Sequence, residues 1–159
     1  AIVDLVRDEE IEAQSDRAKA EAGAAGESAA APETRQSTDR IPQQAIFEAR
    51  REIAAIRVPD AIKRYIADLV YATRTPEKYG DELAQWIDVG GSPRASIALD
   101  RCSRTHAWLQ GRDYVDPEDV RAVVHDCFRR RLSLSYAAEG EGSRADRVID
   151  EVVAQVALP

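Results

Sequence analysis

The sequence predicts an all-α protein: a small helical bundle preceded by a helical arm and a linker. Hydrophobic residues make up 44% of the 159 residues, yet aromatic residues make up only 6%. Such an alanine-rich composition favours helix packing over a sheet of β-branched residues. Apolar residues recur at helical spacing in several segments after residue 41, and two of these segments begin with strong helix-start signals, at Ser92 and Asp116. The length suffices for one domain with its own core.

The first 40 residues are expected to lie outside the bundle. Residues 1–7 are apolar and could form a short helix or strand, and residues 8–22 are charged and alanine-rich, as in a helix with little to bury. Residues 21–39 combine Ala, Gly, Ser and Pro without periodicity, which is typical of a linker. We therefore divide the chain into an arm and linker over residues 1–40 and a helical domain over residues 41–159.

Two helices are expected next, each with one apolar face. The first begins at Pro42, and the second covers residues 60–74 and ends before Pro76. Their faces consist of Ile46, Ala49, Ile53 and Ile56 in the first helix, and of Ile62, Ile66, Leu69, Val70 and Thr73 in the second. Residues 75–91 are predicted as the longest loop of the domain, with Tyr79, Trp86 and Ile87 holding part of it against the core.

The helix expected over residues 93–110 starts with Ser92 as N-cap and Pro93 at the first helical position, where the missing N–H costs nothing. Gly111 is expected to end it. Asp116 and Pro117 repeat this start for a helix over residues 117–128. The side chains expected inside are Ala95, Ala98, Leu99, Cys102 and Leu109 from the first helix, and Val120, Val123, Val124, Cys127 and Phe128 from the second.

The chain is expected to close with a short extended piece and one more helix. Residues 132–136 alternate in polarity and could form a strand or an extended cover. Ser143 and Asp146 have the spacing of a capping box. The helix that they open would bury Val148, Ile149, Val152, Val153 and Val156.

Among the charged residues of the chain, Arg94 has the position best suited to contact a group outside its own helix. Gly90 and Gly91 let the backbone bend before Ser92, so Arg94 lies on the opening turn of a helix and can reach something outside it. Arginine keeps its charge and binds phosphate oxygens with a forked pair of donors. From the pattern alone, however, an ordinary surface arginine is the better account.

Three groups of residues resemble the C-terminal lid of MoxR-type AAA+ ATPases. They are Gly90-Gly91-Ser92-Pro93-Arg94-Ala95, then Gly111-Arg112-Asp113-Tyr114-Val115, then Pro117-Glu118-Asp119-Val120. The resemblance covers residues 41–159, and it extends upstream to Ala72-Thr73-Arg74 and downstream to Leu134-Ser135-Tyr136. The chain departs from the family at Arg130, where the family usually has a histidine, so any role of that histidine does not transfer.

The resemblance implies an AAA+ lid that closes over ATP bound by a core domain outside this sequence. Arg94 would be the sensor-2 arginine that contacts the γ-phosphate, with Ser92 and Pro93 supporting its position. ATP and Mg would be bound through the core domain. The complete protein would be an ATP-hydrolysing, hexamer-type ring with chaperone-like remodelling activity. Its partners would be its own core, neighbouring subunits and von Willebrand factor A-domain proteins.

The chain itself is not expected to be catalytic. A phosphate loop of the form G-x-x-x-x-G-K-[ST] is absent, because none of Lys19, Lys63 and Lys78 has that context, and no apolar strand ends in an Asp-Glu pair. The chain begins at Ala1 and contains no methionine. It is therefore expected to be a piece of a longer protein.

Other residues offer weaker candidates. Arg101 and Arg104 fall near the side of the helix that carries Arg94, so they could contact the core or a neighbouring subunit, or be a solvated face on which Asp100 pairs with Arg104. Arg74 and the run Arg129-Arg130-Arg131 are better explained as helix ends whose charge suits the dipole. A zinc site from Cys102, His106, His125 and Cys127 is disfavoured, because His125 and Cys127 point to different sides of one helix; buried thiols are the better account.

Charge and composition argue against several classes of function and cellular location. A net charge of −7 argues against nucleic-acid binding by phosphate neutralisation. Two cysteines make no disulfide framework, so a cytoplasmic location is expected, and no apolar run of about 20 residues predicts membrane insertion. A second hypothesis is a stand-alone helical adaptor that binds another protein through the face of Arg94, Arg101 and Arg104 or through residues 132–143.

Overall fold

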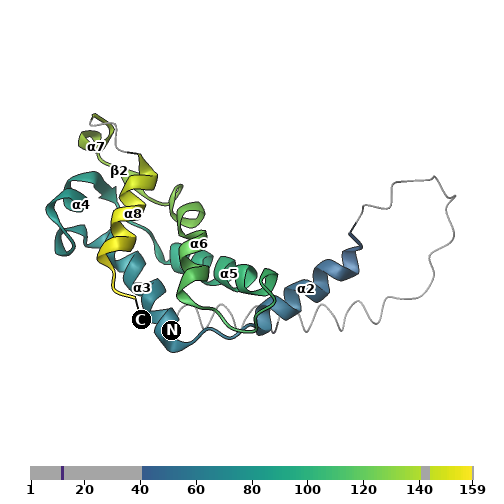
Figure 1. Cartoon of the computed structure of the whole chain (residues 1–159). Coiled ribbons are helices and arrows are strands. Elements are labelled where there is room, and N and C mark those ends of the chain that lie inside the picture. Colours follow the sequence, from purple (N-terminus) through teal and green to yellow (C-terminus); the bar gives the residue numbers. More distant parts are fainter. Residues whose placement is uncertain (1–11, 13–40, 141–143, 159) are drawn as a thin grey trace, which may run out of the picture. The chain divides into compact units, whose positions relative to one another are not determined.

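The computed structural model describes residue 12, residues 41–140 and residues 144–158. The predicted arm and linker lie outside the described residues, except for Glu12, and so does Ser143. The chain divides between Ala55 and Ile56 into two compact units. Figure 1 draws the described helices and strands in colours that follow the sequence. The boundary predicted at residue 40 stays a prediction.

Helix α2 (Gln43–Ala55) belongs to the first unit and is the helix expected after Pro42. Its apolar face is only partly covered. Ala54 is buried and Ile53 is half-buried, whereas Ile46 is 45% exposed.

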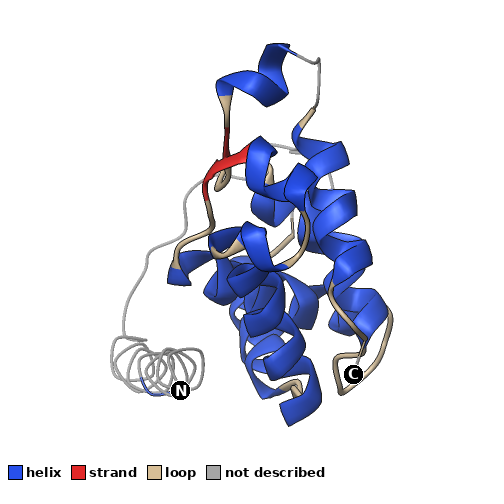
Figure 2. Cartoon of the chain, turned by 90° about the vertical axis from the view of Figure 1, so that its left-hand side faces the viewer, coloured by secondary structure: helices blue, strands red, loops and turns tan. Residues whose placement is uncertain are grey.

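The second unit is a small helical bundle, which confirms the predicted fold class. Its longer helices are α3 (Asp60–Arg74), α5 (Pro93–Leu109), α6 (Pro117–Phe128) and α8 (Ala145–Gln155), and its shorter ones are η1 (Pro76–Lys78), α4 (Asp81–Trp86) and α7 (Tyr136–Gly140). Figure 2 shows how little of the described chain is strand: β1 (Ile87–Val89) pairs with β2 (Ser133–Leu134) in one antiparallel ribbon. The most extensive helix pairing is between α5 and α6.

Aliphatic side chains from these helices form the core. Helix α3 has the predicted bounds, and every member of its predicted stripe is buried. Helices α6 and α8 also bury their predicted faces, although Val123 and Val153 are only partly covered. Burial of one large aliphatic side chain contributes about 1.5–3 kcal/mol, so these faces supply most of the stabilisation. None of the helices in the described part of the chain is both long and apolar enough to cross a bilayer.

The prediction of a long loop over residues 75–91 is wrong. This segment contains η1, α4 and β1, and Gly80 allows the turn between η1 and α4 with a φ of 143°. Trp86 and Ile87 are buried as expected, and Ile87 pairs with Leu134 of β2. Each piece is too short to show a helical or strand period, so the sequence pattern could not identify it.

The predicted buried face of α5 is also wrong in part. Ala95 and Leu99 are buried, but Cys102 is exposed and Leu109 is 67% exposed. Asp100, Ser103, Arg104 and Ala107 are buried in their place. The buried side of the helix therefore includes the charged pair of Asp100 and Arg104, which a search for apolar periodicity misses.

Helix α8 does not begin with the predicted capping box. Its N-cap is Arg144, which makes no side-chain cap hydrogen bond. Asp146 instead accepts a hydrogen bond from Arg129 Nε at 2.9 Å. The carboxylate therefore links α8 to the end of α6.

Candidate functional site

Arg94 lies on the first turn of α5 and its side chain is exposed. Ser92 is the N-cap and Pro93 the first helical residue, as predicted, and Ala95 N donates to Ser92 O at 2.8 Å. Ser92 occupies the N-cap position, but its hydroxyl makes no hydrogen bond to the helix backbone. The positive end of the helix dipole at this helix start adds to the charge of Arg94.

The turn before Arg94 is anchored on the end of α3 through Thr73. Gly91 N donates to Thr73 Oγ1 at 2.8 Å, and the same hydroxyl donates to Val70 O at 2.7 Å. A Cβ on Gly90 would lie 2.2 Å from Thr73 O. Gly90 is therefore required for close approach of two backbones. The sequence placed Thr73 only on an apolar stripe and missed this anchor.

Replacing Gly90 by alanine is expected to lower the free energy of unfolding by about 1–3 kcal/mol, the usual cost of forcing an extra group into a packed contact. Gly140→Ala is the matched control, because a Cβ there meets nothing within 4 Å. Urea unfolding followed by circular dichroism measures both. Equal stability of the two variants would contradict the proposed close approach.

The prediction that Arg94, Arg101 and Arg104 share one exposed side of α5 is confirmed only in part. Arg101 is exposed, but Arg104 is 2% exposed and donates to Asp100 Oδ2 from Nε at 3.0 Å and from Nη2 at 2.7 Å. The Asp100–Arg104 pair is therefore real but buried, not solvated. Arg104 is removed from the candidate interface, while Arg94 and Arg101 stay on the exposed side of α5.

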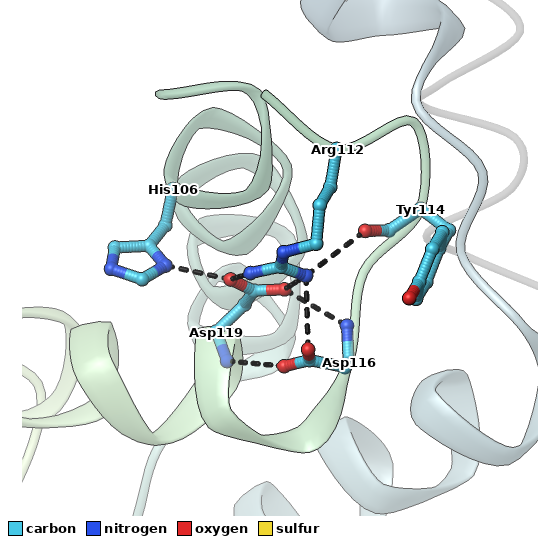
Figure 3. A network of polar contacts seen from close by, with 5 residues as sticks. All are labelled: His106, Arg112, Tyr114, Asp116 and Asp119. Carbon is cyan, nitrogen blue, oxygen red and sulfur yellow. Dashed lines mark hydrogen bonds and ion pairs between the residues drawn. The ribbon is translucent and has the colours of Figure 1, made fainter. Parts of the chain in front are cut away.

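Asp119 holds the connection between α5 and α6 (Figure 3). Its fully buried carboxylate accepts hydrogen bonds from both Arg112 Nη atoms and from Asp116 N at 2.9 Å, and it lies 2.7 Å from His106 Nδ1. Asp116 in turn caps α6 by accepting from Asp119 N at 3.1 Å, so the predicted N-cap is confirmed as a full capping box. From the sequence, Asp119 stood out only as a member of the motif Pro117-Glu118-Asp119-Val120.

Several donors stabilise the charged form of Asp119. Burial raises its pKa, but the hydrogen bonds from Arg112, from Asp116 N and from His106 together outweigh burial and lower the pKa to about 2. Gly111, with φ of 71°, ends α5 as predicted and turns the chain so that Arg112 reaches this carboxylate. The network gives a rigid α5–α6 hairpin, and hence a fixed direction for the helix that carries Arg94.

Three of the remaining candidates, His125, Arg129 and Arg131, have local partners. His125 contacts Asp150 at 3.0 Å and Asp146 at 3.4 Å, and within residues 12, 41–140 and 144–158 no cluster of three metal-binding side chains is found. Arg131 Nη1 donates to Cys127 O at 2.7 Å, as expected for an arginine at a helix end, and Arg129 pairs with Asp126 and Asp146. Arg74 and Arg130 are exposed.

Residues 83–152 match the AAA lid domain family. The chain is 41% identical over 111 residues to the chaperone MoxR1 of Mycobacterium tuberculosis, covering 69% of this chain and 29% of that protein. It is 38% identical over 105 residues to protein MoxR of Paracoccus denitrificans, covering 62% and 31%. A crystal structure of a proposed ATPase from Cytophaga hutchinsonii matches with a TM-score of 0.71 and 36% identity, over 73% of this chain and 36% of that one. The chain thus spans about a third of the length of these relatives.

Proposed function

Because this chain carries an AAA lid domain of the kind found in MoxR-family proteins, we propose that it acts as the lid of a MoxR-type AAA+ ATPase. The lid closes over a nucleotide that a separate core domain binds, and Arg94 is its sensor-2 residue. One observation carries the proposal: Arg94 is exposed on the first turn of α5, and the turn before it is anchored to α3.

The chemistry of Arg94 suits a phosphate contact. A guanidinium donates two parallel hydrogen bonds to phosphate oxygens, and it stays charged at any physiological pH. Helix starts favour anions for the same electrostatic reason. A contact to a terminal phosphate is lost after hydrolysis, so the lid angle reports the state of the nucleotide.

ATP and Mg²⁺ belong to the core domain in this proposal. Among the described residues, Arg94 is the group that we propose for a phosphate contact, and the rest of the nucleotide site is assigned to the core domain. When bound by the core, Mg²⁺ supplies charge neutralisation at the transferring phosphate. The lid contributes orientation, exclusion of water and the Arg94 charge.

The exposed face of α5 is the proposed contact with the core or a neighbouring subunit. Arg94 and Arg101 are seven residues apart, about two helical turns, and both are exposed. The resemblance to the MoxR family supports a hexamer-type ring with chaperone-like remodelling and von Willebrand factor A-domain proteins as partners.

The isolated 159-residue chain is expected to show no ATP hydrolysis above the buffer rate and no calorimetric binding of Mg·ATP at micromolar concentrations. The reason is that one solvated arginine cannot hold a nucleotide without the core. Micromolar binding of Mg·ATP that disappears in Arg94→Ala would contradict the proposal that the nucleotide is held by the core domain and not by the lid. The function itself is tested by turnover of Arg94 variants in a polypeptide that contains both the lid and its core.

A further inference from the structure

Thr73, near the end of α3, links that helix to the turn that leads into α5. The residue is fully buried. Its hydroxyl accepts a hydrogen bond from Gly91 N at 2.8 Å and donates one to Val70 O at 2.7 Å. Valine has a similar shape but no hydroxyl, so the bond to Gly91 N is what threonine adds at this position. A buried amide without a partner would cost free energy, and the Thr73 hydroxyl removes that cost.

The first turn of α5 packs against the same glycine. A Cβ built on Gly91 would lie 3.2 Å from Ala95 Cβ and 3.4 Å from Thr73 Oγ1. Ala95 is fully buried, and its N donates to Ser92 O at 2.8 Å. Gly91 is thus in close contact with both Thr73 and Ala95. Arg94 directly precedes Ala95, so the backbone that carries its side chain depends on the bond between Thr73 and Gly91.

We propose that Thr73 is a positioning residue for ATP turnover, whose hydroxyl fixes the Gly91 turn and thereby the position of Arg94 at the phosphate. This inference rests on the proposed role of Arg94 as the sensor-2 residue. Thr73 is buried, so it acts through Arg94 and does not touch the nucleotide. The Arg94 side chain makes no hydrogen bond or ion pair with the described residues, so its position is set by its backbone. A misplacement of about 1 Å in a reacting geometry can cost about 10²-fold in rate.

A purely structural role of the hydroxyl would have a different signature. Removing a group that only stabilises the bundle lowers the free energy of unfolding but leaves the kcat of the folded protein unchanged. Removing a positioning group lowers kcat in molecules that are folded, because the transition-state contact is lost while ATP binding by the core is kept. Measurement of kcat and KM on folded protein therefore separates the two roles.

The test compares Thr73→Val with Thr73→Ser in a polypeptide that joins this lid to its core. Thr73→Val removes the acceptor of Gly91 N, so kcat is expected to fall about 10-fold while KM for ATP stays within about twofold of wild type. Thr73→Ser keeps the hydroxyl and should keep kcat within about twofold of wild type. Steady-state phosphate release at several ATP concentrations gives both constants, and circular dichroism checks the fold. Equal kcat values for Thr73→Val and wild type would overturn the inference.

Thr75→Val is the matched control. Thr75 lies at the same end of α3, but its hydroxyl donates to Tyr71 O at 3.0 Å, within the helix rather than to the turn before α5. The same substitution there should leave kcat within about twofold of wild type. An equal loss of kcat in Thr75→Val and Thr73→Val would overturn the inference, because the loss would then not depend on the bond to Gly91.

Thr73→Cys keeps the inference testable if Thr73→Val does not fold. A thiol accepts hydrogen bonds only weakly, so kcat should be lower than that of Thr73→Ser by about threefold or more. Equal kcat values for these two variants would show that the acceptor strength at this position does not affect turnover, and the inference would be wrong.

Combination with Arg94→Ala separates a failure of this inference from a failure of the proposed function. If Thr73 acts through Arg94, Thr73→Val should lower kcat by less than about twofold in a chain that already carries Arg94→Ala. A full 10-fold loss in that background, as expected for independent effects, would overturn the inference and leave the sensor-2 role of Arg94 standing. Normal turnover in Arg94→Ala alone would overturn the proposed function, and this inference with it.

Discussion

Arg94→Ala is expected to lower ATP turnover about 10²–10³-fold in a polypeptide that joins this lid to its core, the loss typical for one preorganised group that stabilises transition-state charge. The effect should fall mainly on kcat, because a terminal-phosphate contact strengthens as charge develops during phosphoryl transfer. The measurement is steady-state phosphate release at several ATP concentrations.

Arg94→Lys is the more discriminating variant. Lysine keeps the charge but loses the forked donor pair, so turnover between that of alanine and that of wild type is expected. Stability should not change in either variant, since Arg94 is exposed at the helix start and makes no side-chain hydrogen bond or ion pair with the described residues.

The matched control is Arg64→Ala, which removes another exposed arginine from the same domain, on α3. It should leave turnover within about twofold of wild type, as expected for surface substitutions away from special features. Turnover of Arg94→Ala equal to that of Arg64→Ala would remove Arg94 from the nucleotide contact while leaving the lid fold intact.

The sequence predicted those parts of the bundle whose signals are local and repeated. Helix α3 shows its stripe over four turns, and the N-cap plus proline pairs at Ser92 and Asp116 mark the starts of α5 and α6. Arg94 could be placed because its position depends only on such a start signal. By contrast, α4 is shorter than two helical turns and β1 is shorter than two repeats of a strand pattern. Their structure therefore depends on the core that they cover, and the local sequence does not indicate it.

The missed features depend on contacts between distant residues. The buried side of α5 contains Asp100 and Arg104, whose charges neutralise each other in the interior, and no apolar pattern can indicate such a pair. The Thr73–Gly91 hydrogen bond joins residues 18 positions apart. Asp119 receives donors from three positions around a turn, whereas the sequence indicated only the helix start at Asp116.

Asp119 is the residue whose loss should most affect stability. Asp119→Ala is expected to lower the free energy of unfolding by about 3 kcal/mol, because removing one partner of a buried ion pair leaves donors unsatisfied. The estimate lies at the low end for buried pairs, since the Arg112 side chain is 25% exposed and keeps its contact with Asp116 at 3.0 Å. Urea unfolding at pH 7 measures the change.

The pH dependence gives an independent check on the same carboxylate. Its folded pKa is about 2, below the unfolded value of 3.8. The stabilisation is therefore fully present above about pH 4 and is lost as the pH falls toward 2, with a total of about 2–3 kcal/mol. In Asp119→Asn this contribution should be absent, so the stability gap between wild type and variant should narrow over that pH range.

Asp113→Asn provides the matched control for both experiments. Asp113 lies in the same connection, but its side chain is 81% exposed and its contact with Arg57 is 3.6 Å long, so the change should cost less than about 1 kcal/mol at any pH. If Asp119→Asn destabilised the chain no more than Asp113→Asn at pH 7, the buried network would not hold the α5–α6 hairpin. The direction of α5, and with it the aim of Arg94, would then depend on the apolar contacts between the two helices alone.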